Sequence, residues 1–217
     1  QGAGGPLRVA VECHTCFDWL MPSMDVYRNR WPEVELDIVS GFHADPVGLL
    51  HKGEAELAIV SELCEEEGIV SFPLFRFEMV GVVPVDSKLA KRAYLKPSDF
   101  ADQTLLTYPV PDDMLDVIKH FLTPAGVQVK RRSSELTVAL LQLVASKRGL
   151  SALPAWAVKG YVDRGYVAQV PLGRKGLTST LYAALPKAIA GKHYTADFVA
   201  VMREVCAREL VGIELLG

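Results

Sequence analysis

The sequence predicts an α/β protein made of two Rossmann-like lobes joined by a hinge of two strands. Apolar strand-like runs alternate with helical patterns over residues 7–61, and this order repeats over residues 103–170. Two further strand-like runs, at residues 78–83 and 178–185, can each cross from one lobe to the other. Clefts between lobes are common ligand sites, and hinge closure is the motion expected there. We therefore expect a protein that binds a small molecule.

Composition limits the function further. The chain has 217 residues, of which 50% are hydrophobic and 23% charged, with a formal net charge of −3. This balance lacks the basic excess needed to neutralise nucleic-acid phosphates, so these residues should not bind DNA by themselves. The sequence has no apolar run long enough for a membrane span, and its four scattered cysteines do not form a secreted disulfide framework. These features favour a cytoplasmic protein.

The first set of elements opens with an apolar strand at residues 7–11, and a helix then begins near Cys16 and ends before Pro32. Helical spacing predicts one buried face, formed by Phe17, Leu20, Met21, Met24, Tyr27 and Trp31. Next come a strand at 34–40, a helix capped by Asp45 and a strand at 56–61. This order predicts a parallel βαβαβ unit.

Two strands, at 69–75 and 78–83, are then expected with a tight link at Arg76-Phe77. The second set repeats the first, with strands at 103–108, 127–132, 150–154 and 167–170 and helices at Asp112–Leu122, after Ser133-Ser134, and at 156–160. The terminal helix begins at Thr195. These limits predict a tag or linker remnant at residues 1–6, lobe I at 7–83 and 186–217, and lobe II at 84–185.

Several strings resemble the effector-binding domain of LysR-type transcriptional regulators, over most of the chain. The general ones are Leu20-Met21-Pro22, Trp31-Pro32-Glu33-Val34, and Gly53 to Ile59, in which Glu56 stands where the family usually has aspartate. More specific strings are Glu12 to Cys16, Tyr108 to Val110, Phe121 to Val127 and Ala152 to Trp156. These are similar to the subgroup that responds to homocysteine and controls methionine biosynthesis genes. The resemblance implies a fold like that of type II periplasmic binding proteins.

The resemblance also implies an effector site between the lobes, at the loop after the first strand, the end of the third strand, and the strand ends of the second lobe. Carried onto this sequence, the site comprises Glu12, Cys13, His14, Thr15, Cys16, Ser61, Tyr108, Pro109, Val110, Ser133, Ser134 and Thr137. Homocysteine has a carboxylate that helix-start amides and hydroxyls can accept, an ammonium suited to Glu12, and a thiol that prefers an apolar wall. No other cofactor is expected.

Each of these residues also has a simpler interpretation. Thr15, Ser61 and Ser134 could be no more than helix caps. The Cys13-His14-Thr15-Cys16 spacing also fits a metal or redox motif, but a structural zinc needs four ligands, and Cys64 and Cys206 lie in separate segments. A ligand loop explains the His-Thr interior equally well.

The sequence contains no esterase elbow, phosphate loop, dinucleotide fingerprint or His-Glu-x-x-His motif, so an enzyme is not predicted. The second hypothesis is a free-standing solute-binding protein of the same fold, for an amino acid or small anion. An upstream winged helix-turn-helix, absent from this chain, would support the regulator and would bind the DNA. A signal peptide would support the solute binder.

The partner expected besides the effector is a second copy of the chain. The helix at 17–31 is apolar over more than one face, because its large apolar residues, Trp19, Val26 and Tyr27 among them, lie off the core-facing stripe as well as on it. The resemblance implies a head-to-tail homodimer through the lobe faces. The full-length protein could also form a tetramer. The second-lobe partner would be the helix from Asp112 to Leu122, which carries Lys119 and His120.

Overall fold

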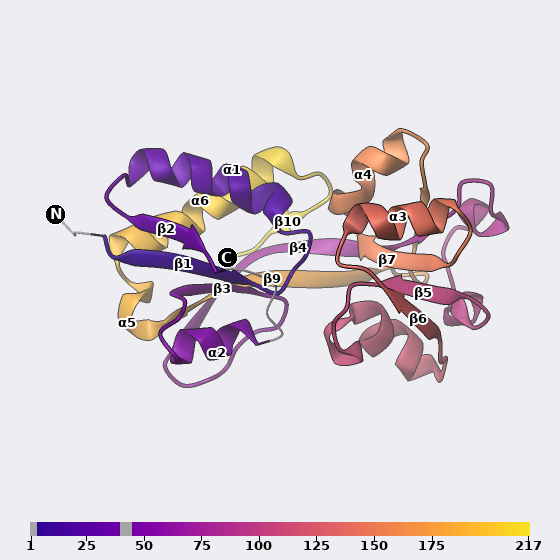
Figure 1. The fold of residues 1–217 in the computed structure, drawn as a ribbon, viewed down its shortest axis with the longest axis horizontal. Coiled ribbons are helices and arrows are strands. Elements are labelled where there is room, and N and C mark those ends of the chain that lie inside the picture. The colour runs from indigo at the N-terminus through magenta and orange to yellow at the C-terminus, as the bar shows by residue number, and fades with distance from the viewer. Residues whose placement is uncertain (1–3, 40–44) are drawn as a thin grey trace. The chain divides into compact units, whose positions relative to one another are not determined.

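The computed structural model describes residues 4–39 and 45–217, and these form the predicted α/β fold (Figure 1). The chain divides into two compact units. Unit 1 comprises Gln1–Arg76 and Thr180–Gly217, and unit 2 comprises Phe77–Ser179. The chain passes between the units twice, inside the two long strands β4 (Ile69–Val83) and β9 (Leu177–Pro186). Each unit is described separately below.

In the sheet of unit 1 the first strand lies between the second and the third. The strand β1 (Pro6–Val11) pairs in parallel with β2 (Glu35–Ile38) on one side and with β3 (Leu57–Val60) on the other. The strand β3 pairs antiparallel with β9, and the short strand β10 (Glu214–Leu215) pairs antiparallel with β4. Parallel pairing brings the carboxyl ends of β1 and β3 to one edge of the sheet, where ligands of open α/β sheets bind.

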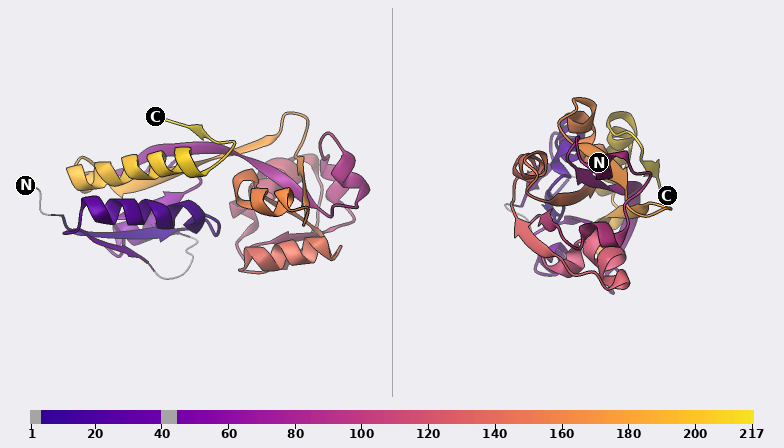
Figure 2. Two further views of the ribbon diagram at one scale, coloured as in Figure 1. Left: turned by 90° about the horizontal axis from the view of Figure 1, so that it is seen from above. Right: turned by 90° about the vertical axis from the view of Figure 1, so that its right-hand side faces the viewer.

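Helices cover both faces of this sheet (Figures 1 and 2). On one face α1 (Phe17–Arg30) lies beside α6 (His193–Glu209), while α2 (Pro46–His51) and the small side chains of β1 and β3 form the other. The expected Asp45 cap of α2 is present, since its carboxylate accepts from the Gly48 N–H at 3.0 Å. The short helix α5 (Lys187–Ala190) precedes α6. The strand expected at 34–40 ends at Ile38, and residue 40 lies outside the described part of the chain.

The predicted faces of α1 are wrong in part. Tyr27, expected on the buried face, is fully buried inside unit 1, and so is Trp19, which was not part of that predicted face. The Trp19 ring contacts Phe75 edge-on, and Tyr27 contacts Phe198 of α6 and donates its hydroxyl hydrogen to the Tyr194 carbonyl at 2.8 Å. Met21, expected inside, is 49% exposed. The terminal helix covers the second apolar face, a contact that the local pattern of α1 cannot reveal.

The expected tight link at Arg76-Phe77 is also wrong, because β4 runs unbroken for 15 residues. Neither residue has the φ freedom or the turn chemistry of glycine, proline or asparagine. The first part of β4 pairs with β10 in unit 1, and the second part pairs with β7 (Leu150–Pro154) and β8 (Ala168–Pro171) in unit 2. A strand that serves two units needs no reversal.

In unit 2 the strand order is β4, β7, β5 (Thr104–Thr107) and β6 (Lys130–Ser133), and β5 pairs in parallel with both neighbours. Residues of β5 alternate between two cores. Leu106 faces the helices α3 (Thr137–Ala145) and α4 (Ala155–Asp163), whereas Leu105 faces the core built from Val117, Ile118 and Leu122. This alternation is the period-two pattern of a strand buried on both faces.

The helix expected at Asp112–Leu122 is not an α-helix. Asp112–Met114 forms a 3-10 turn, Val117–Leu122 a π-helical segment, and Thr123–Ala125 a further 3-10 turn. The Asp112 carboxylate pairs with Arg131. Two more 3-10 turns, Lys88–Lys91 and Pro97–Phe100, lie between β4 and β5. Within the described residues, none of the helices combines the length and apolar character required to cross a membrane.

Candidate functional site

Polar groups gather at the edge of unit 1 where β1 and β3 end. Glu12 directly follows β1, and Ser61 directly follows β3. The Glu12 carboxylate accepts from the Ser61 backbone N–H at 3.0 Å and also from the Ser61 hydroxyl. Two adjacent strand ends are thus joined through a partly buried carboxylate. Ser61 therefore orients Glu12.

The loop after Glu12 contains a disulfide. Cys13 and Cys16 are bonded to each other, with their Cα atoms 5.4 Å apart. The sequence analysis treated them as two thiols in a ligand loop and did not predict the bond. A cystine provides a sulfur-rich, apolar wall instead of two hydrogen-bonding thiols. Cys16 is fully buried, while Cys13 keeps some exposure.

Thr15 lies inside this loop and is 6% exposed. Its hydroxyl oxygen is 3.4 Å from Sγ of Cys13. The N-cap residue of α1 is Cys16, and no side chain caps the helix. Among the described hydrogen bonds, the Thr15 side chain therefore contacts the disulfide and does not act as the cap that the simpler interpretation required. The positive end of α1 remains directed at the loop.

His14 is half-buried in the same loop. Burial lowers its pKa from 6.5 to about 4, because removing water disfavours the charged imidazolium. The imidazole is therefore neutral near pH 7. At that pH the formal charge of the loop comes from Glu12.

This shift predicts a pH dependence of stability. Between about pH 6.5 and 4 the unfolded chain binds a proton at His14 that the folded chain does not, so the free energy of unfolding should fall as the pH is lowered through this window. A His14→Gln variant should lose that part of the dependence. Urea denaturation of both proteins at pH 7 and pH 5 measures it, and equal pH slopes would contradict a buried neutral His14.

Unit 2 carries a second set of polar groups at the ends of β5 and β6. Tyr108 follows β5, and its hydroxyl is 2.6 Å from Oγ1 of Thr137, the first residue of α3. Ser133 ends β6, and the Ser134 hydroxyl accepts from the Leu136 N–H at 3.2 Å. Ser134 thus stabilises the turn before α3, but it is not the helix cap, because the N-cap residue is Leu136 and no side chain caps α3.

Arg131, which the sequence analysis missed, holds the loop containing Tyr108, Pro109 and Val110. Its guanidinium donates to the Tyr108 carbonyl at 3.2 Å and to the Val110 carbonyl at 2.8 Å. It also donates to the Thr107 hydroxyl at 2.9 Å and pairs with Asp112. The sequence Lys130-Arg131-Arg132 offered no signal that one of three cations would turn inward.

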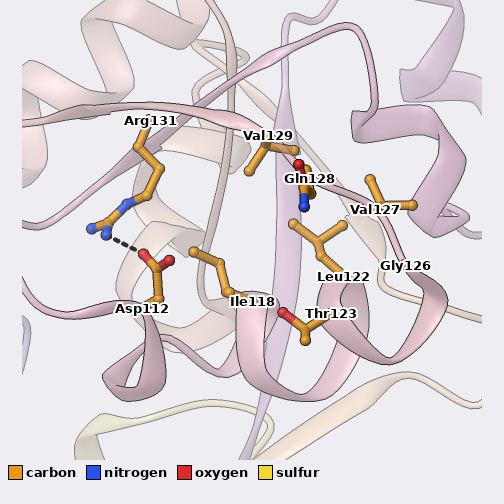
Figure 3. A pocket seen from close by; sticks show the side chains of 9 residues that line it. All are labelled: Asp112, Ile118, Leu122, Thr123, Gly126, Val127, Gln128, Val129 and Arg131. Carbon is orange, nitrogen blue, oxygen red and sulfur yellow. Dashed lines mark hydrogen bonds and ion pairs between the residues drawn. The ribbon is translucent and has the colours of Figure 1, made fainter.

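Arg131 also lines a cavity of about 420 Å³ in unit 2, between the π-helical segment and the chain leading into β6 (Figure 3). Its walls are formed by Asp112, Ile118, Leu122, Thr123, Gly126, Val127, Gln128, Val129 and Arg131. The cavity is therefore mixed in character, with apolar walls and an ion pair at one end.

The remaining cysteines lie outside both groups. Cys206 is fully buried in α6, and burial raises its pKa to about 12, which makes it an unreactive core residue. Cys64 is a partly exposed free thiol in the loop after β3. In the part of the chain that the structure describes, no group of three or more potential ligands is placed to hold a metal ion.

Comparison with known proteins agrees with this architecture. The family model described as LysR substrate binding domain matches residues 1–207. The transcriptional regulator MetR of Haemophilus influenzae is 47% identical over 217 residues, which is 100% of this chain and 70% of that protein. MetR of Escherichia coli K12 is 39% identical over 197 residues, covering 91% of this chain and 62% of that protein. These relatives carry the names of transcriptional regulators and not of enzymes.

A solved structure supports the same assignment. The regulatory domain of MetR from Neisseria meningitidis, in a variant with two cysteines replaced by serine, aligns with a TM-score of 0.93 and 50% identity over 99% of this chain and 100% of that domain. The unmodified domain gives the same TM-score, 0.93. LysR regulatory domains have the type II periplasmic-binding-protein fold expected from the sequence. The chain therefore belongs to the LysR substrate-binding-domain family, as a relative of MetR regulatory domains.

Proposed function

We propose that this chain is the effector-sensing part of a longer MetR-like regulator and that its effector is homocysteine. The observation that carries the proposal is the loop from Glu12 to Cys16, a carboxylate and a sulfur-rich wall beside the start of α1. The effector ammonium would pair with Glu12, and its carboxylate would accept from the amides at the start of α1 and from Thr15. Its sulfur would contact the cystine.

The resemblance assigns the rest of the site to Tyr108, Pro109, Val110, Ser133, Ser134 and Thr137 in unit 2, and that assignment is part of the proposal. The chain spans only 62–70% of the curated relatives named above. Control of methionine biosynthesis genes, DNA binding by a separate winged helix-turn-helix and a cytoplasmic location are therefore proposed for the whole protein.

Calorimetry tests the effector directly. Homocysteine should bind the 217-residue chain with measurable heat. Methionine and serine should bind more weakly, because the sulfur of methionine carries a methyl group and serine has no sulfur. No heat with homocysteine, together with heat for another metabolite, would contradict the effector assignment. The family assignment does not depend on this result.

Two hydroxyls provide a sharper test. Thr15→Val and Ser134→Ala should each weaken homocysteine binding by about 1–3 kcal/mol, the range for a hydrogen bond to a charged group, without unfolding the chain. Binding by calorimetry and thermal stability are measured on the same samples. If Ser134→Ala lowers the melting temperature and leaves the affinity unchanged, Ser134 is only the turn-stabilising residue before α3.

We further propose that two copies pair head to tail, unit 1 of one against unit 2 of the other. The units have complementary charge, since unit 1 has nine Lys and Arg against seventeen Asp and Glu, and unit 2 has fourteen against nine. In the described residues, β2 and β6 are edge strands, each with one partner. On α1, Met21 and Val26 remain for a contact, and the cavity between Ile118 and Val129 would accept such side chains.

Light scattering at tens of micromolar should therefore report a dimer, because a specific interface buries about 800 Å² on each partner. Val26→Asp should shift the protein towards monomer. Val211→Asp is the matched control, since Val211 is an exposed apolar residue of unit 1 outside α1 and β2. A monomeric parent protein, or equal effects of the two substitutions, would contradict the proposed face.

A further inference from the structure

The two sulfurs of the Cys13–Cys16 disulfide lie in unequal surroundings. Cys13 is partly exposed on the loop after β1, whereas Cys16 is fully buried at the start of α1. A small thiol can therefore reach Sγ of Cys13 more easily than Sγ of Cys16. Disulfides exchange by attack of a thiolate on one sulfur, with the other sulfur leaving.

We propose that this disulfide exchanges with a small-molecule thiol, which becomes bonded to Cys13. The thiolate of the ligand attacks Sγ of Cys13 and forms a new S–S bond. The Cys13–Cys16 bond breaks, and its electron pair leaves on Sγ of Cys16 as a thiolate. One disulfide replaces another, so no separate oxidant or reductant is consumed. Attack by Cys16 on the mixed disulfide reverses the step and releases the ligand.

The surroundings favour this direction of attack. Cys16 is the N-cap residue of α1, where the positive end of the helix dipole stabilises a leaving thiolate. The Thr15 hydroxyl, 3.4 Å from Sγ of Cys13, can hydrogen-bond to sulfur at the attacked position. Glu12, oriented by Ser61, can hold the ammonium of an amino-acid thiol in the same loop. The identity of the thiol as homocysteine rests on the proposed function above.

The chain provides its own controls. Cys64 is a partly exposed free thiol in unit 1 that has no cysteine partner, and Cys206 is buried. In a Cys16→Ser chain treated with the disulfide homocystine, Cys13 and Cys64 are both free thiols, and a nonspecific exchange would modify them at equal rates. A reaction directed by the loop would prefer Cys13.

The experiment uses the 217-residue chain with its disulfide formed. After incubation with homocysteine, free thiols are alkylated in acid, and the modified cysteines are located by peptide mass spectrometry. We expect homocysteine on Cys13 and the alkyl group on Cys16. Cys16→Ser prevents reversal, so homocystine should leave a lasting adduct on Cys13. In Cys13→Ser the adduct on Cys16 should form at least about tenfold more slowly, because that sulfur is buried.

An absence of adduct on Cys13 in both the parent chain and Cys16→Ser would overturn the proposal. Equal rates of modification at Cys13 and Cys64 in the Cys16→Ser chain treated with homocystine would also overturn it. A Cys13→Ala/Cys16→Ala variant separates the proposed disulfide exchange from the proposed effector. If it still binds homocysteine in calorimetry while the parent chain forms no adduct, the exchange fails and the effector assignment survives. If cysteine and glutathione modify Cys13 as fast as homocysteine and no heat of binding is seen, the exchange holds and the effector assignment fails.

Discussion

Replacing Glu12 with glutamine should weaken homocysteine binding by about 1.5–3 kcal/mol, or roughly 10- to 150-fold. Glutamine keeps an oxygen that can accept from Ser61, so the substitution removes the charge and preserves the shape. The affinity falls because the substitution removes the ion pair between the partly buried carboxylate and the effector ammonium. Calorimetry measures the change in affinity, and thermal unfolding measures the fold.

Glu35→Gln is the matched control, because Glu35 is exposed on β2 and carries the same charge. It should leave the affinity unchanged. If the Glu12→Gln protein binds homocysteine as tightly as the parent chain, the effector ammonium does not pair with Glu12. Equal losses in both variants would instead indicate a long-range charge effect, which added salt would screen.

Arg131→Met should lower the free energy of unfolding by about 2–4 kcal/mol. Methionine keeps most of the apolar stem and removes the donors that hold the Thr107 hydroxyl and the carbonyls of Tyr108 and Val110. Thr107 is only 5% exposed, so water cannot fully replace its bond. Arg131→Lys should also destabilise, because one ammonium lacks the planar fork that reaches several acceptors at once. Urea denaturation measures both variants.

Two neighbours serve as controls. Arg132→Met changes an exposed cation on the same strand and should alter stability by less than about 0.5 kcal/mol. Asp112→Asn breaks the ion pair with Arg131, but the Asp112 side chain is 66% exposed, so its contribution should also be small. If Asp112→Asn costs as much as Arg131→Met, the ion pair and not the backbone hydrogen bonds stabilises the loop.

Much of the fold could be predicted because the signals were local. Strand β1 and helices α1 and α2 came from apolar periodicity, from the Asp45 cap and from Pro32 as a helix stop. Prediction failed where a side chain found a distant partner. The segment after Asp112 is not an α-helix, and Asp112 is engaged by Arg131, which is 19 residues further along the chain.

For the candidate site, the sequence predicted positions in the fold but not side-chain contacts. The sequence placed Glu12 and Ser61 at strand ends, and parallel pairing of β1 with β3 then required those ends to be neighbours. It could not show that Ser61 donates to Glu12, nor that the thiols of Cys13 and Cys16 would be joined. Two cysteines three residues apart favoured a ligand loop over a metal or redox motif, and the spacing alone does not reveal a disulfide.

The sequence by itself determined the order of strands and helices, the repeated α/β units and the family, since these depend on periodicity, turn residues and short strings. Only the tertiary structure decided how many apolar residues of α1 are covered, because Trp19, outside the predicted buried face, packs against Phe75 of β4 from a distant part of the chain. It also decided that Arg131 turns inward. A cation pairs with whatever acceptors the fold brings within about 3 Å, and no local pattern encodes that distance.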